Sequence, residues 1–255
     1  MFLVLRTEPF CRARNPISRL FQKPLPPKLE RVAVRGGAFF YSAVLHADKR
    51  GQTDFSVLLP LGGCVQRIVP GGDLPPLPAP FAVFTPRLYP ACLFMQSALY
   101  FLQQLTGKAP LPLLGIWDEC GLLADCVPPF ADLAAHICIF TKAPQRYAAV
   151  CEQVFCTRGL PLILSDSEST LRPCAARLYP FAENAPPYFP GRIVLDSGSM
   201  YAGEGLTLPE ELEARRPQGT DVLQFASALR ELCNVPLPET LRFDALRPIK
   251  SGKIY

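Results

Sequence analysis

The stretch LPLLGIWDECGLLADCVPPFADLAAHICIFTK, residues 111–142, decides the fold class. An apolar run ends at Trp117, a turn and an apolar helix-like segment follow, and a second apolar run covers residues 137–140. Neither run alternates polar with apolar residues, which is typical of strands buried on both faces of a parallel sheet. The stretch therefore predicts a strand–helix–strand unit. Pro128 and Pro129 predict that its helix is kinked or divided, because proline cannot donate a helical hydrogen bond.

The same alternation continues on both sides of this unit. A helix is expected at 91–105, and another at 144–158, where Pro144 suits the first turn and Gly159 the end. Strands linked by helices favour an α/β fold, which we expect to be Rossmann-like, with a mostly parallel sheet and helices on both faces. Further strands are expected at 160–165, 177–181 and 191–196, and further helices at 209–216 and 220–234.

Residues 1–75 predict a separate N-terminal part, followed by the α/β domain at 76–255. Short β-like runs lie at 31–35, 38–46, 54–59 and 64–69, and turn-forming residues join them. These turn compositions favour a small antiparallel β-meander. The first 28 residues contain six basic residues and one acidic residue, Glu8, and predict a solvated, partly docked basic arm. A proline-rich segment at 70–80 marks the boundary.

The composition predicts a globular cytoplasmic protein. Hydrophobic residues make up 49% of the 255 residues and charged residues 19%, which favours a large packed core. The longest apolar segment, 88–105, contains Pro90 and three glutamines, so no membrane span is expected. Residues 2–5 are too short an apolar run for a secretory signal. The net charge of +4 gives no strong nucleic-acid signal.

The cysteines and histidines predict no metal site. Ten cysteines and two histidines are present, and no pair of cysteines has the C-x-x-C spacing of zinc or redox sites. In a reducing compartment, cysteine serves as a small apolar residue. We therefore interpret these thiols as structural.

Polar residues that follow the buried runs form the candidate ligand site. In open parallel sheets, ligands bind beyond the carboxyl ends of the strands. The candidates share this position at the end of a run, or lie in the turn that follows it. They are Asp118, Gly121, Thr141, Lys142 and Asp166.

The turn after Trp117 does not carry the glycine fingerprint of dinucleotide-binding sites. The three glycine positions fall on or near Asp118, Cys120 and Leu123, and a carboxylate there repels a pyrophosphate. We favour Asp118 as a cap of the following segment. Lys142, after the next strand, could still suit a 2′-phosphate, so an NADP-linked oxidoreductase with a degenerate turn stays open.

Residues 162–171, LILSDSESTL, resemble the nucleophile strand of haloacid-dehalogenase-type phosphatases. The resemblance implies that Asp166 attacks phosphorus, that Glu168 stands at the acid–base position, and that a magnesium ion is bound. Glu168 replaces the aspartate of the family pattern, and Thr170 matches it. The alternative, which we favour, is a capping box in which Ser165 and Glu168 open a short helix.

The leading functional hypothesis is a cytosolic Rossmann-like binding or regulatory module with a small-molecule or protein partner. It depends on the fold pattern and on the incomplete fingerprints. The alternative is an enzyme, either the NADP-linked oxidoreductase or a magnesium-dependent phosphotransfer enzyme using Asp166. The sequence assigns no catalytic residue, no cofactor and no oligomeric state.

Overall fold

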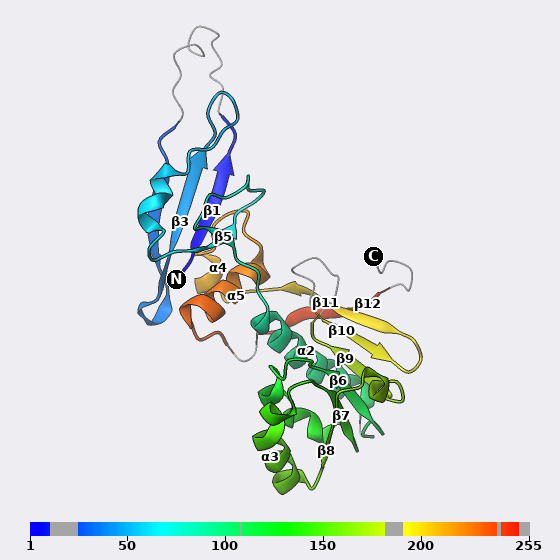
Figure 1. Cartoon of the computed structure of the whole chain (residues 1–255). Coiled ribbons are helices and arrows are strands. Elements are labelled where there is room, and N and C mark those ends of the chain that lie inside the picture. Colours follow the sequence, from blue (N-terminus) through cyan, green and yellow to red (C-terminus); the bar gives the residue numbers. More distant parts are fainter. Residues whose placement is uncertain (11–24, 108, 182–190, 239–240, 250–255) are drawn as a thin grey trace. The chain divides into compact units, whose positions relative to one another are not determined.

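The computed structural model describes residues 1–10, 25–107, 109–181, 191–238 and 241–249 (Figure 1). The chain forms two compact units. The first contains Met1–Pro86 and Leu208–Pro238, and the second contains Arg87–Thr207 and Glu239–Tyr255. Each unit has its own sheet, and the second sheet combines parallel and antiparallel strands. The chain is therefore a mixed α/β protein.

The first unit is built on a five-stranded sheet in the order β2-β3-β1-β4-β5. Only β2 and β3 are antiparallel, while β1 runs parallel to both β3 and β4, and β4 is parallel to β5. The expected antiparallel meander is therefore confirmed only at the β2–β3 hairpin. The strands are β1 (Leu3–Glu8), β2 (Lys28–Ala33), β3 (Phe39–His46), β4 (Arg67–Pro70) and β5 (Ala82–Val83).

Two predictions for the first unit need correction. The segment expected to be solvated and only partly docked begins with the central strand β1, because Phe2 and Leu3 are apolar enough to be fully buried. Of that arm, residues 11–24 lie outside the described residues. The run at 54–59 is not a strand, since Ser56–Leu61 form the 3-10 helix η2. The Asp54 carboxylate accepts the Ser56 backbone N–H, which favours a turn of helix there.

Helices α4 (Glu210–Glu213) and α5 (Val222–Cys233) complete the first unit. The Asp221 carboxylate accepts the Gln224 backbone N–H at 2.7 Å and caps α5. Phe225 of α5 is fully buried and meets the rings of Phe2 and Phe40 edge-on, at 6.3 and 5.4 Å between centroids. Residues 208–238 are distant from the N-terminus in sequence, yet they complete the core of the N-terminal sheet.

The second unit is built on a seven-stranded sheet in the order β12-β11-β10-β9-β6-β7-β8. Strands β9, β6, β7 and β8 are parallel, and β10, β11 and β12 continue the sheet in antiparallel fashion. The strands are β6 (Leu114–Trp117), β7 (Ile137–Phe140), β8 (Leu162–Ser165), β9 (Ala176–Tyr179), β10 (Arg192–Leu195), β11 (Met200–Leu206) and β12 (Phe243–Ile249).

The predicted helices of the second unit are mostly confirmed. Helix α2 covers Leu88–Thr106, and the short η5 (Pro144–Tyr147) leads into α3 (Ala148–Arg158), which ends at the left-handed Gly159. Between β6 and β7 there is no α-helix, only the 3-10 helices η3 (Ala124–Cys126) and η4 (Pro128–Asp132). Within the described ranges, no helix is both long enough and apolar enough to cross a membrane.

The two faces of the second sheet are covered differently. On one face, strand residues such as Leu114 and Ile116 are fully buried, and Phe101 of α2 contacts Tyr201. On the opposite face lies the 3-10 helix η6 (Glu168–Leu171). A Cβ on Gly115 would come within 3.0 Å of the Cys174 Sγ, so the glycine permits this close packing. The expected second layer of α-helices is absent from the described residues.

Candidate functional site

The loops after β6 and β7 bring four of the five predicted ligand residues together. Gly121 donates its N–H to the Asp118 carbonyl, and a Cβ on Gly121 would lie 3.1 Å from the Ala143 carbonyl. The Lys142 ammonium and the Glu119 carboxylate form an ion pair at 2.5 Å. The buried Thr141 lies in the same loops, while Asp166 follows β8, is exposed and lies outside this network.

Asp118 is a buried carboxylate whose oxygens already have partners. It accepts the backbone N–H of Leu122 at 3.0 Å and of Leu123 at 2.8 Å. It also accepts a hydrogen bond from the hydroxyl of Tyr147, the last residue of η5, at 2.7 Å. Asp118 therefore ties the turn after β6 to the segment that opens α3, and whether these loops also bind a ligand stays a prediction.

Tyr147→Phe tests the bond to Asp118. Burial and the Asp118 carboxylate raise the pKa of Tyr147 above its ordinary value. The folded protein therefore keeps a proton that the unfolded chain loses near pH 10, so this contribution is complete below pH ~10 and is lost as the pH rises further. We expect Tyr147→Phe to lower the unfolding free energy by about 1–3 kcal/mol at pH 7. The difference in Tm between the two proteins should narrow above pH ~10; a constant difference would contradict the account.

A second polar group lies on the face of the same sheet that carries η6. Trp117 on β6, Tyr179 on β9 and Arg192 on β10 are side by side there. The Trp117 and Tyr179 rings are 6.2 Å apart, and the Arg192 guanidinium lies 5.1 Å from the Tyr179 centroid. Arg177, two residues before Tyr179 on β9, pairs with Gly115 and points to the same face.

This face concentrates buried donors that have no acceptor. Five buried side-chain nitrogen or oxygen atoms lack a hydrogen-bond partner in the part of the chain that the structure describes. Three of the five are Trp117 Nε1, Arg177 Nε and Arg192 Nε. Buried polar groups in folded proteins are almost always paired, and each unpaired one costs about 1–3 kcal/mol. Three unpaired donors on adjacent strands therefore indicate a place for an acceptor.

A pocket of about 260 Å³ opens between η6 and β9, and of the three donor residues only Arg177 lines it, while Trp117 and Arg192 flank its Tyr179 wall. Arg172 and Arg177 contribute positive charge, Glu168 contributes one negative charge, and Tyr179 forms part of the wall. Within the described residues, no ion pair involves Arg172, Arg177 or Arg192. The remaining lining residues are Ser169 and Leu171. We call this the arginine pocket.

Arg177 also affects the pKa of a buried thiol, Cys174. The hydrogen bond with the Cys138 thiol raises the pKa of the Cys174 thiol most, and burial raises it further. The positive charge of Arg177 lowers it. Cys174 and Cys138 are buried with Leu171 and Phe140 in one apolar cluster. Arg177 therefore lies at the boundary between this cluster and the pocket, where the effective dielectric constant is lower than in water.

The sequence contained a weak signal for the arginine pocket. Arg177 and Tyr179 alternate with Ala176 and Leu178, so their strand has one apolar face and one polar face, unlike β6 and β7. We interpreted this segment only as an additional strand. Among the described residues, no group of three His, Cys, Asp or Glu side chains could hold a metal ion.

No protein-family model matches the chain, and no curated protein or solved structure matches it either. The case for a function therefore depends on the chemistry of the residues described above.

Proposed function

We propose that the second unit is a Rossmann-like binding module whose ligand carries a phosphate group or a similar oxyanion. The strand order β8-β7-β6-β9 supports the fold assignment, since it matches the 3-2-1-4 order of the first strands in doubly wound sheets. None of the nine cysteines in the described residues forms a disulfide, which suits the reducing conditions of the cytoplasm.

The observation that carries the proposal is the group of three buried N–H donors without acceptors. Trp117 Nε1, Arg177 Nε and Arg192 Nε come from neighbouring strands, and two of them belong to permanently charged guanidinium groups. An oxyanion has several acceptor oxygens and can accept charge-assisted hydrogen bonds from such donors. It would supply the partners that the described residues do not.

The charge balance favours a dianion over a monoanion. Arg172 and Arg177 line the pocket together with the single carboxylate of Glu168. Arg192 is not a lining residue, but its guanidinium lies over the Tyr179 ring of the pocket wall, so these four side chains together carry an excess of two positive charges. Phosphate monoesters carry between −1.5 and −2 charges at pH 7. Guanidinium groups match phosphate geometry in a bidentate manner. A phosphate monoester therefore fits this pocket better than a carboxylate does.

Arg177→Met tests the proposal by isothermal titration calorimetry with inorganic phosphate. Methionine keeps much of the side-chain volume and removes the charge and the donors. A hydrogen bond to a charged group contributes about 1.5–3 kcal/mol, so we expect phosphate to bind about 10- to 100-fold more weakly to the variant. The matched control is Arg158→Met, which removes an exposed arginine paired with Asp132. The control should bind phosphate within about twofold of the unchanged protein.

Three results would contradict the proposal. One is that phosphate does not bind to the unchanged protein, and another is that it binds Arg177→Met equally well. The third is that NADPH binds and that Lys142→Met abolishes its binding while Arg177→Met does not, since the loops after β6 and β7 would then hold the ligand.

A further inference from the structure

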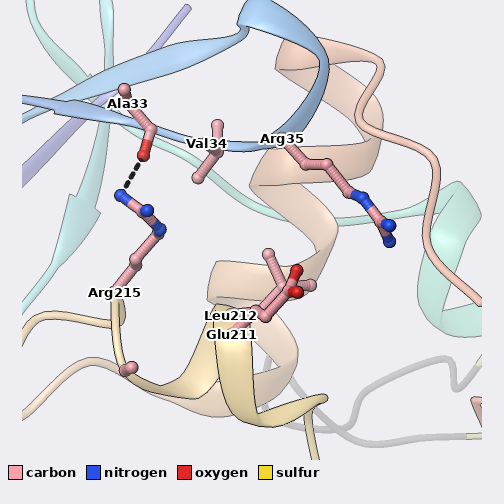
Figure 2. Close-up of a pocket in the computed structure, with 7 residues that line it drawn as sticks. Ala33, Val34, Arg35, Glu211, Leu212 and Arg215 are labelled. Atoms are coloured by element: carbon pink, nitrogen blue, oxygen red, sulfur yellow. Dashed lines mark hydrogen bonds between the residues drawn. The ribbon is translucent and has the colours of Figure 1, made fainter.

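The first unit has a free sheet edge beside a second pocket (Figure 2). In the described residues β2 pairs with β3 alone, and five of its six residues are exposed. Leu29 on β2 is 40% exposed, although it is a large apolar side chain. An unpaired edge of this kind is a template for another extended chain.

The hydrogen bonds fix which peptide groups face this edge. The Val34 N–H donates to the Ala38 carbonyl at 2.8 Å, so these two residues form a bonded pair of the hairpin. Because bonded pairs alternate in antiparallel strands, the peptide groups of Leu29, Arg31 and Ala33 point to the free edge. Ala33 shows this directly, since its carbonyl accepts the Arg215 Nη1 at 2.6 Å.

The pocket of about 650 Å³ lies at the Ala33 end of that edge. In Figure 2, Arg215 reaches Ala33 on one side, and Arg35 lies on the other side beyond Val34. Glu211 is the one acidic lining residue, so the charged side chains leave an excess of one positive charge. The apolar side chains of Val34 and Leu212 are buried and form part of its wall.

We propose that this edge and pocket bind the C-terminal strand of a partner protein. The Arg215 guanidinium stands in line with the outward peptide groups of β2, where the main chain of an added strand would end. A terminal α-carboxylate fits there, because it is a main-chain group with the single negative charge that the pocket lacks. The added strand runs parallel to β2, with its carboxylate on Arg215 and its peptide groups on Leu29 and Arg31.

An array of random heptapeptides tests this docking site. Each peptide is synthesised once with a free α-carboxylate and once as the α-amide, and fluorescently labelled protein is applied. We expect a subset of free-carboxylate peptides to bind at least tenfold more strongly than their amides. Arg215→Gln and Arg35→Gln should each reduce that binding at least tenfold. Arg50→Gln, an exposed arginine in the turn after β3, should leave it unchanged.

Arg35→Gln keeps the test valid if Arg215→Gln loosens the hairpin, since Arg215 also binds Ala33. Thermal unfolding of each variant shows whether the first unit is intact. The proposal is overturned if no free-carboxylate peptide binds, if amides bind equally well, or if binding survives both substitutions. Preferential binding of amidated peptides that carry internal Asp or Glu would also overturn it, because the occupant would then be an acidic side chain.

Discussion

Asp118→Ala is expected to lower the free energy of unfolding of the second unit by about 2–5 kcal/mol. The substitution leaves the Leu123 N–H and the Tyr147 hydroxyl without their acceptor, and Asp118 is fully buried. Each buried donor left unpaired costs about 1–3 kcal/mol, and the lost packing of the carboxylate adds to this. Chemical denaturation followed by fluorescence of Trp117, the one tryptophan of the chain, measures the change next to the site.

The matched control for Asp118→Ala is Asp132→Ala. Asp132 is exposed and pairs with Arg158 at 2.9 Å, and exposed pairs contribute about 0–1 kcal/mol. A loss of stability for Asp118→Ala no larger than for Asp132→Ala would show that Asp118 does not hold the turn after β6. The carboxylate would then be available to a ligand, as the sequence first predicted.

Phe225→Ala is expected to cost the first unit about 3–5 kcal/mol. Its ring is fully buried edge-on against the stacked rings of Phe2 and Phe40, which belong to the N-terminal sheet region. Removal of the ring leaves a cavity that the stacked pair of Phe2 and Phe40 cannot fill without losing its own contact at 5.1 Å. Urea denaturation monitored by circular dichroism measures the loss.

Phe155→Ala is the matched control for Phe225→Ala. Phe155 is 59% exposed on α3, so its loss should change stability by no more than about 0.5 kcal/mol. Equal effects of the two substitutions would show that α5 does not complete the core of the first unit. Leu208–Pro238 and the N-terminal sheet would then not share one core.

The strands and helices with strong local signals were predictable from the sequence. β6 and β7 are uninterrupted apolar runs, and the helix at 144–158 has Pro144 in its first turn and Gly159 at its end. These are local features, since a strand buried on both faces must be apolar and a left-handed end favours glycine. Pro128 and Pro129 likewise predicted a divided segment between these strands, although its two pieces are 3-10 helices and not the expected α-helix.

Pairings distant in sequence were not predictable. The run 2–5 has too few residues to identify a strand alone, and it is buried only because β3 and β4 pair with β1 on either side. The sequence 237–255 contains no pattern that predicts an element, yet Phe243–Ile249 form β12 by pairing with β11. Residues 196–205 are rich in Gly and Ser, which favours a loop, but they contain the first residues of β11 for the same reason.

The candidate site was predictable only in part. A rule for strand ends located Asp118 and Lys142, and the structure does bring their loops together. The strand-end rule cannot tell whether a polar atom already has a hydrogen-bond partner, because that depends on the three-dimensional structure. The arginine pocket depends on Arg177, and Arg192 lies beside it on the same face because β9 and β10 form an antiparallel pair that no local sequence signal predicts.

The indole N–H of Trp117, whose ring lies 6.2 Å from the Tyr179 ring in the wall of the arginine pocket, gives the most direct test of the proposed oxyanion site. The chain contains one tryptophan, so its Nε1–H gives a single resonance in a ¹H–¹⁵N spectrum. We expect this resonance to shift saturably during titration with a phosphate monoester, because the buried donor gains an acceptor. The shift should be lost in Arg177→Met and kept in Arg158→Met. A resonance that does not move at saturating ligand would contradict the account.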